Sequence, residues 1–128
     1  MRRLPLLLAA CGALSACAYF EGGALGRKYV VFFGRDSASL DHAARGVVAR
    51  AADAAADNPA LDLLVESYAG ANGPVDADEA LATRRGDVVA DALRADGVAA
   101  NRIQLRPRPP SNENPGIAAR RVEIDFGN

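Results

Sequence analysis

The sequence predicts a two-layer α/β sandwich (α+β) in which two helices cover one face of a mixed sheet. Three observations support this prediction. Segments with the apolar period of strands and of helices follow one another in the order β-α-β-α-β-β. Turn residues such as glycine, proline and asparagine separate these segments. The length of 128 residues is that of a single domain once a short N-terminal segment is set aside.

Residues 1–16 have the features of a secretory signal peptide: Arg2 and Arg3 at the start, a short apolar run, and small residues at the end. The apolar run is too short to span a membrane as a helix. The motif LSAC, which ends at Cys17, resembles the lipobox of bacterial lipoproteins, and this resemblance implies that Cys17 is lipidated. The motif LAAC, which ends at Cys11, also fits but leaves a shorter apolar run. Ordinary cleavage after an alanine, with Cys17 as a free thiol, is the alternative.

Residues 17–28 are expected to form the lipidated N-terminus and a short linker, and residues 29–128 the folded domain. In the lipoproteins that the motif resembles, a non-acidic residue such as Ala18 after the cysteine favours the outer membrane, which places the domain in the periplasm. Both cysteines precede the domain, so core packing must stabilise it. The signal segment removes two of the 15 basic residues and none of the 16 acidic ones. This balance predicts no nucleic-acid partner.

The first strand and helix follow the linker. Residues 29–33 form a continuous apolar run, which is typical of a strand covered on both faces. Ser39 or Asp41 can cap the next helix, which should end near Asp57 because an Asn-Pro pair follows it. The apolar stripe of this helix has mostly small side chains that allow close packing on a sheet: Leu40, Ala43, Ala44, Val47, Val48, Ala51, Ala54 and Ala55.

The second strand and helix are separated by a loop rich in turn residues. The strand is expected at residues 61–68. The helix should begin at Asp76 or Asp78 and end at Asp96, with Gly97 as its C-terminal cap.

Two strands complete the predicted sheet. A short strand is expected at residues 102–106, and the loop at residues 107–116 contains four prolines, which cannot enter the centre of a sheet. The last strand is expected at residues 120–126. Its charged side chains alternate with three apolar ones that should face the core: Val122, Ile124 and Phe126.

Arg85 lies near the centre of the apolar stripe of the second helix, and Arg84 lies at its edge. A guanidinium keeps its proton in proteins, so on a buried face it needs a partner. One interpretation is an internal ion pair with a nearby aspartate or glutamate. The other is a site for an anion that a ligand brings. The stripe itself consists of Leu81, Val88, Val89, Ala92 and Leu93.

The pattern of reactive residues predicts a protein that is not an enzyme. The domain has no cysteine, and His42, the single histidine, falls on the polar face of its helix. The sequence has neither a Gly-x-Ser-x-Gly elbow nor a cluster with metal-ligand spacing. We therefore expect no cofactor and no metal.

Four segments together resemble one known family. Residues 31–40 (VFFGRDSASL) resemble its opening strand and Asp-Ser-Ala-x-Leu turn, and residues 78–86 (DEALATRRG) its Asn-x-x-Leu-Ser-x-x-Arg-Ala helix motif. Residues 97–103 and 120–124 resemble its Gly-Val, Arg-Ile and Arg-Arg-Val-Glu-Ile segments. The family is the OmpA C-terminal-like domain, the periplasmic module that holds peptidoglycan in outer-membrane proteins and peptidoglycan-associated lipoproteins. The resemblance covers residues 28–126.

This resemblance implies a ligand, the diaminopimelate of the peptidoglycan stem peptide, which carries a free ammonium and a free carboxylate. Such a ligand needs an aspartate for the ammonium and an arginine for the carboxylate. Arg85 matches the family's arginine, whereas Gly70 stands where the family has its ammonium-binding aspartate. Asp78, or Asp76, is a candidate replacement; alternatively Asp78 caps the helix and neutralises Arg85. The candidate peptidoglycan-binding residues are Arg85, Asp78, Ala69, Gly70 and Arg120.

Arg120 and Arg121 allow two interpretations: they bond the preceding loop, or they contact the ligand. By strand alternation Arg120 shares the face of Val122 and Ile124, which makes it the better site candidate. The sequence as a whole predicts an outer-membrane lipoprotein that binds peptidoglycan non-covalently and links the membrane to the cell wall, with other envelope proteins as further partners. The alternative is a degenerate OmpA-like domain without wall binding that acts as a protein-interaction or envelope-assembly module.

Overall fold

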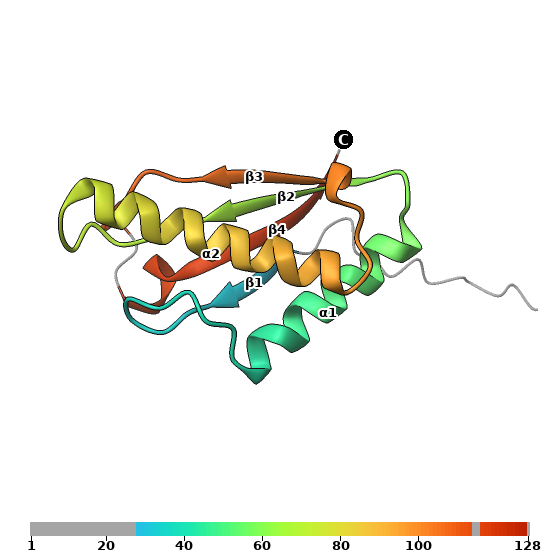
Figure 1. Ribbon diagram of the computed structural model, residues 1–128, viewed down its shortest axis with the longest axis horizontal. Coiled ribbons are helices and arrows are strands. Elements are labelled where there is room, and N and C mark those ends of the chain that lie inside the picture. Colours follow the sequence, from blue (N-terminus) through green and yellow to red (C-terminus); the bar gives the residue numbers. More distant parts are fainter. Residues whose placement is uncertain (1–27, 114–115, 128) are drawn as a thin grey trace, which may run out of the picture.

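The computed structural model describes residues 28–113 and 116–127 (Figure 1). The predicted signal peptide, the lipidation site at Cys17 and nearly all of the predicted linker lie outside the described residues. The elements of the domain are β1 (Tyr29–Phe32), α1 (His42–Asp57), β2 (Asp62–Ser67), α2 (Val75–Ala95), the 3-10 turn η2 (Ala100–Arg102), β3 (Ile103–Pro107), the 3-10 turn η3 (Gly116–Ala119) and β4 (Arg121–Gly127).

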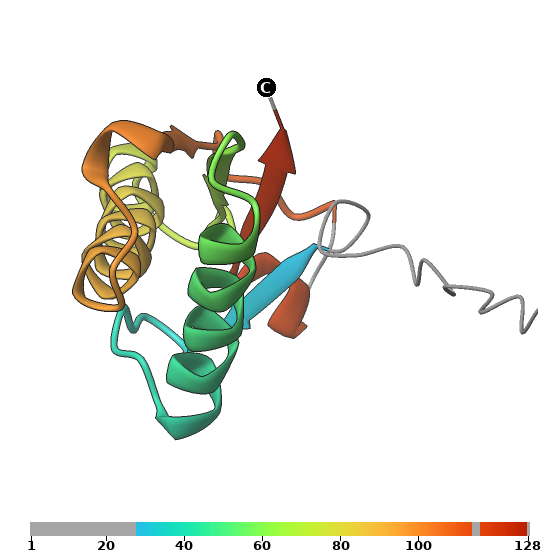
Figure 2. The ribbon, with the colours of Figure 1, turned by 90° about the vertical axis from the view of Figure 1, so that its right-hand side faces the viewer.

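The four strands form one mixed sheet in the order β1-β4-β2-β3. The strand β4 pairs antiparallel with both β1 and β2, and β2 pairs parallel with β3. Both helices lie on the same side of this sheet, as Figure 2 shows. The predicted two-layer α/β sandwich and its element order are therefore confirmed.

The core lies between this face of the sheet and the two helices. From the sheet it takes alternate residues of the strands, such as Val31, Leu63 and Ile124, all fully buried. From α2 it takes Val89 and Leu93. From α1 it takes mainly alanines, which let this helix pack close to the strands: Ala44, Ala51, Ala52 and Ala55.

The N-terminus of α1 is capped as the sequence predicts. The Asp41 carboxylate accepts a hydrogen bond of 2.7 Å from the backbone N–H of Ala44. The helix ends at Asp57, also as expected. The buried stripe of α1 differs from the predicted stripe at two positions: Ala43 is exposed and Ala52 is buried. The buried face is therefore rotated slightly from the predicted one.

The prediction that residues 29–33 are covered on both faces is wrong. The strand β1 ends at Phe32, whose side chain is 44% exposed, while Val31 and Phe33 are buried. Both helices lie on one side of the sheet, so neither of these described helices covers the other face of β1 (Figure 2). The apolar run is thus an edge strand with one covered face.

The residue Arg102, predicted to begin the third strand, belongs instead to η2. Its guanidinium donates hydrogen bonds to the carbonyl oxygens of Leu61, at 2.7 and 2.9 Å, and of Asn58 and Ala55, at 2.8 and 3.1 Å. These bonds satisfy carbonyls at the end of α1 and before β2. They tie the edge strand β3 to both elements.

The helix α2 begins one residue before the predicted range, at Val75, with Pro74 at its N-cap. It ends at Ala95, followed by Asp96, and Gly97 has the positive φ of 103° expected of a C-terminal cap glycine. Within the described ranges, no helix is long and apolar enough to cross a membrane.

Candidate functional site

A cavity of about 800 Å³ opens at one end of the domain. The turn after β1, the loop between β2 and α2, the start of α2 and the segment before β4 meet there, and Figure 1 shows these segments at the same end of the molecule. The charged residues that line this cavity are Arg35, Asp36, Asp78, Arg85 and Arg120. Four of the five predicted site residues therefore meet around one space, because Gly70 also lines it.

Arg85 is the most buried charged residue described, with 1% of its surface exposed. Its guanidinium donates to three main-chain carbonyls: Nε to Ser37 at 2.8 Å, Nη1 to Tyr68 at 3.1 Å and Nη2 to Gly34 at 3.2 Å. The same group lies 5.5 Å from the centroid of the Phe33 ring. The Arg85 side chain, which comes from α2, thus connects the turn after β1 to the end of β2.

The predicted internal ion pair of Arg85 is not formed, because no carboxylate among the described residues lies within salt-bridge distance of it. Burial lowers the pKa of the Arg85 guanidinium, and the positive charges of Arg120 and Arg84 act in the same direction, against Asp36. A guanidinium still keeps its proton in a protein. The cavity therefore contains a buried positive charge that main-chain carbonyls solvate and that forms no salt bridge within the described part of the chain.

Asp78 neither pairs with Arg85 nor serves as the N-cap residue of α2. Its Oδ2 accepts two hydrogen bonds of 3.0 Å, from the backbone N–H groups of Asn72 and Gly73. The residue is 9% exposed. Its role in the fold is to hold the loop that forms one wall of the cavity, and it lines the cavity itself.

Gly70 lies on this loop, and the space beside it is already filled. A Cβ atom at this position would lie 2.7 Å from Nδ2 of Asn72 and 3.3 Å from its Cγ. The carboxamide of Asn72 therefore occupies the volume that a side chain at position 70 would need. Ala69 does not line the cavity; it is buried beside a smaller hollow of about 130 Å³ with Tyr68 and Arg108.

Arg120 and Arg121 lie on opposite faces of the sheet. Arg120 lines the cavity, and its Nε donates to the carbonyl of Phe33 at 3.0 Å. Arg121 donates to the carbonyl of Ala118 and to Glu123, and its guanidinium stacks 3.7 Å from the centroid of Tyr68. The first interpretation holds for Arg121, which bonds the preceding segment at Ala118. Arg120 bonds Phe33 instead and lines the cavity, and its contact with a ligand stays a prediction.

Sequence reasoning missed Arg35, Asp36 and Asn72 as lining residues. The sequence indicated a turn at Asp36, and the structure gives this residue a φ of 52°, a conformation that aspartate tolerates better than most residues. A turn does not by itself indicate a cavity. Asn72 gave no signal beyond its place in a turn-rich loop.

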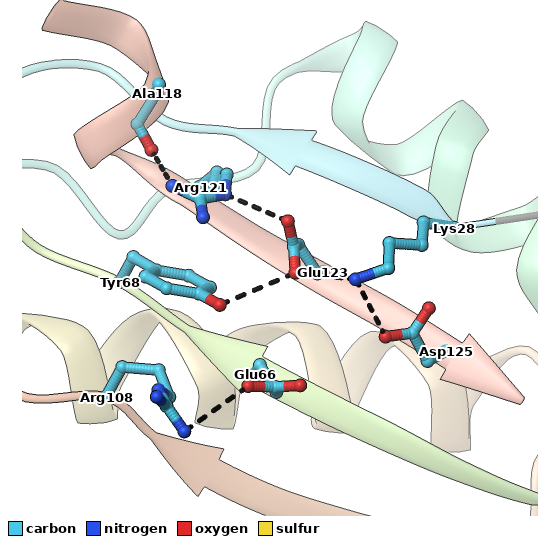
Figure 3. Close-up of polar contacts among 8 residues, drawn as sticks. All are labelled: Lys28, Glu66, Tyr68, Arg108, Ala118, Arg121, Glu123 and Asp125. Carbon is cyan, nitrogen blue, oxygen red and sulfur yellow. Dashed lines mark hydrogen bonds and ion pairs between the residues drawn. The ribbon is translucent and has the colours of Figure 1, made fainter. Parts of the chain in front are cut away.

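The open face of the sheet carries a network of charged groups around Glu123 (Figure 3). Glu123 accepts a hydrogen bond of 3.1 Å from Nε of Arg121, and Nζ of Lys28 lies 3.5 Å from both Glu123 and Asp125. Burial raises the pKa of the Glu123 carboxyl, but the Arg121 hydrogen bond and the Lys28 charge outweigh it, so the pKa lies below its ordinary value.

This network predicts a pH-dependent contribution to stability. A lowered folded-state pKa means that ionised Glu123 stabilises the fold above the unfolded-state pKa, and the effect disappears as the pH falls through the folded-state value. We expect Glu123→Gln to reduce the free energy of unfolding by about 1 kcal/mol at neutral pH, and by much less at about pH 3. Urea unfolding at both pH values measures this. A loss of unfolding free energy that is the same at both pH values would contradict this prediction. So would the same pH dependence in Glu79→Gln, a control on the exposed side of α2.

A four-stranded mixed sheet with two helices on one face is the fold of solved OmpA-like domains. The model of the OmpA family matches residues 32–121. The chain therefore belongs to the OmpA family. No curated protein matches the chain.

Solved structures of this fold superpose on the domain. The peptidoglycan-associated lipoprotein from Burkholderia pseudomallei is 19% identical with a TM-score of 0.70, over 77% of this chain and 90% of that one. The OmpA-like domain of FopA1 from Francisella tularensis subsp. tularensis SCHU S4 is 19% identical with a TM-score of 0.68, over 79% and 75%. The C-terminal domain of Helicobacter pylori MotB is 18% identical with a TM-score of 0.67, over 77% and 84%.

Proposed function

We propose that this protein is an outer-membrane lipoprotein whose OmpA-like domain binds peptidoglycan non-covalently in the periplasm and links the membrane to the cell wall. The observation that carries this proposal is the buried, unneutralised guanidinium of Arg85 at the cavity. A carboxylate is the ligand group that a guanidinium binds best, because two parallel hydrogen bonds add to the charge attraction. The free carboxylate of a diaminopimelate stem peptide has this chemistry.

The other residues of the cavity give the proposed site its form. Arg120 adds a second guanidinium, and its Nη groups are free of protein hydrogen bonds among the residues described. Asp78 and Gly70 line the loop wall, and Ala69 is buried next to Gly70 in the chain. The lipobox-like motif that ends at Cys17 supports this cysteine as the lipid anchor. The domain binds its ligand without catalysis, cofactor or metal.

One observation favours the alternative, an OmpA-like domain that has lost wall binding. The wall of the cavity at Gly70 presents a neutral carboxamide instead of a carboxylate. In this alternative the arginines of the cavity and the open face of the sheet, with Phe32 exposed, contact another envelope protein. The two functions differ in one prediction: only the first requires the protein to bind isolated cell walls.

Co-sedimentation with sacculi of the diaminopimelate type decides between them. We expect the full-length protein in detergent to pellet with sacculi, and Arg120→Ala to weaken binding about tenfold, because a cavity cation is lost. Arg84→Ala is the matched control, since Arg84 is exposed and does not line the cavity. Circular dichroism verifies that both variants fold. A wild-type protein that stays in solution with sacculi would refute the proposal and support the protein-interaction function.

A further inference from the structure

The cavity and the point where the N-terminal segment joins the domain lie at opposite ends of β1. The strand begins at Tyr29, directly after Lys28. The turn that follows β1 supplies Arg35 and Asp36 to the lining of the cavity. Figure 1 shows β1 running toward the end of the molecule where the segments of the cavity meet. A pull between the N-terminal segment and a ligand in the cavity therefore acts along β1.

Two arginines of the cavity are fastened to the main chain at this end of β1. Arg120, the residue before β4, donates from Nε to the carbonyl of Phe33 at 3.0 Å. Its own carbonyl accepts the N–H of Phe33 at 2.8 Å. Arg85 donates to the carbonyl of Gly34 at 3.2 Å. A ligand held by either arginine is thus connected to the end of β1 through a single side chain.

The strand next to β1 is β4, which runs in the opposite direction. Tyr29 pairs with Ile124 at the end away from the cavity. Phe32 pairs with Arg121 at the end near it. Among the strands described, β1 pairs with β4 alone, whereas β4 is also held by six residue pairs with β2. The hydrogen bonds of an antiparallel pair are perpendicular to the strands. A force along β1 therefore shears these bonds together, and a force across the strands breaks them one after another.

We propose that β1 carries the tension between the membrane anchor and the cell wall, and that the domain resists force along this strand far better than force across it. At the end where tension enters, Nζ of Lys28 lies 3.5 Å from both Glu123 and Asp125 on β4. On the helix side, Val31 and Phe33 are buried in the core and hold the strand in place. This inference rests on the proposed function, which supplies the anchor and the ligand.

Single-molecule force spectroscopy with two pulling geometries tests this inference. The full chain is produced in the cytosol so that Cys17 stays a free thiol, and Cys11→Ser makes Cys17 the N-terminal attachment point for a DNA handle. The second handle is attached through Ile117→Cys, a 54% exposed position before β4. In the other geometry it is attached through Gly127→Cys at the far end of β4, where a Cβ meets no atom within 4 Å. The first geometry shears β1 against β4, and the second peels β1 away. Circular dichroism verifies that both variants fold.

We expect the unfolding force through Ile117→Cys to exceed the force through Gly127→Cys by about threefold. The reason is that the hydrogen bonds between β1 and β4 share the load in the first geometry and fail in turn in the second. Forced unfolding is governed by the unfolding rate, so both forces are measured at the same loading rate. A ratio below about twofold overturns the inference.

Two matched core truncations locate the resistance to force. Val31 on β1 and Val65 on β2 are both fully buried in the same core. Val31→Ala and Val65→Ala should therefore lower the free energy of unfolding in urea by similar amounts. In the shear geometry, Val31→Ala should lower the unfolding force, and Val65→Ala should leave it nearly unchanged. An equal loss of force in both variants would place the first break outside the contact between β1 and β4, and would also overturn the inference.

The proposed function is judged by different data. Co-sedimentation measures binding to sacculi without tension. Sacculus binding can therefore hold while the two pulling geometries give equal forces, and this result overturns only the inference. A wild-type protein that stays in solution with sacculi refutes the proposed function, even where the two forces differ as expected.

Discussion

Arg85→Met should lower the free energy of unfolding by about 3 kcal/mol, although the substitution replaces a buried charge with an apolar side chain of similar length. The reason lies in the three carbonyls of Gly34, Ser37 and Tyr68, which lose their donor together. Each of these part-buried acceptors costs about 1 kcal/mol when it loses its donor. This loss exceeds the gain from removing a desolvated cation. Urea unfolding monitored by circular dichroism measures the difference.

Arg85→Lys is the matched control, because it keeps the charge but cannot donate in three directions. The free energy of unfolding of Arg85→Lys should lie between those of the wild type and Arg85→Met. A methionine variant within about 0.5 kcal/mol of the wild type would mean that the three bonds contribute little. The same bonds complicate binding experiments, since Arg85 also shapes the cavity. Loss of sacculus binding in an Arg85 variant therefore reports on both roles.

Gly86→Val should destabilise the domain by about 3 kcal/mol because it overpacks the contact between α2 and β2. Glycine inside a helix usually costs about 1 kcal/mol relative to alanine, so its presence here requires a packing reason. A Cβ at Gly86 would lie 2.9 Å from Oγ and 3.3 Å from Cβ of Ser67, which is 1% exposed. The helix and the strand are therefore too close for a branched side chain.

Smaller changes at the same contact test this explanation. Gly86→Ala should cost about 1 kcal/mol in the wild-type background and less in Ser67→Ala, which removes the nearest atom. The Oγ of Ser67 has no hydrogen-bond partner among the described residues, so Ser67→Ala alone should be close to neutral. Thermal unfolding of the wild type, the two single variants and the double variant gives the coupling energy. Strict additivity would show that the two residues do not compete for space.

Local patterns predicted most of the fold. The cap at Asp41, the positive φ at Gly97 and the alternation of β4 each depend on residues close in sequence, and all three agree with the structure. The prediction for residues 29–33 failed because the length and composition of an apolar run do not show whether one or both faces of the strand are covered. The side on which the helices pack decides which face remains open, and here both helices pack on the same side.

The site was less predictable for a different physical reason. Periodicity correctly placed Arg85 in the core, but its partners are main-chain carbonyls that lie 17, 48 and 51 residues away in sequence. Arg102 and Asp78 also bond backbone atoms. Every residue has such atoms, so neither composition nor residue spacing indicates which of them accept these bonds. Sequence reasoning therefore searched for carboxylate partners and found candidates that the structure does not use.

The backbone anchoring of Arg85 has an evolutionary consequence. Because the acceptors are carbonyl oxygens, the amino acids at Gly34, Ser37 and Tyr68 can drift while the attachment points persist. Mutations in the surrounding loops can thus sample new ligand preferences without dismantling the scaffold.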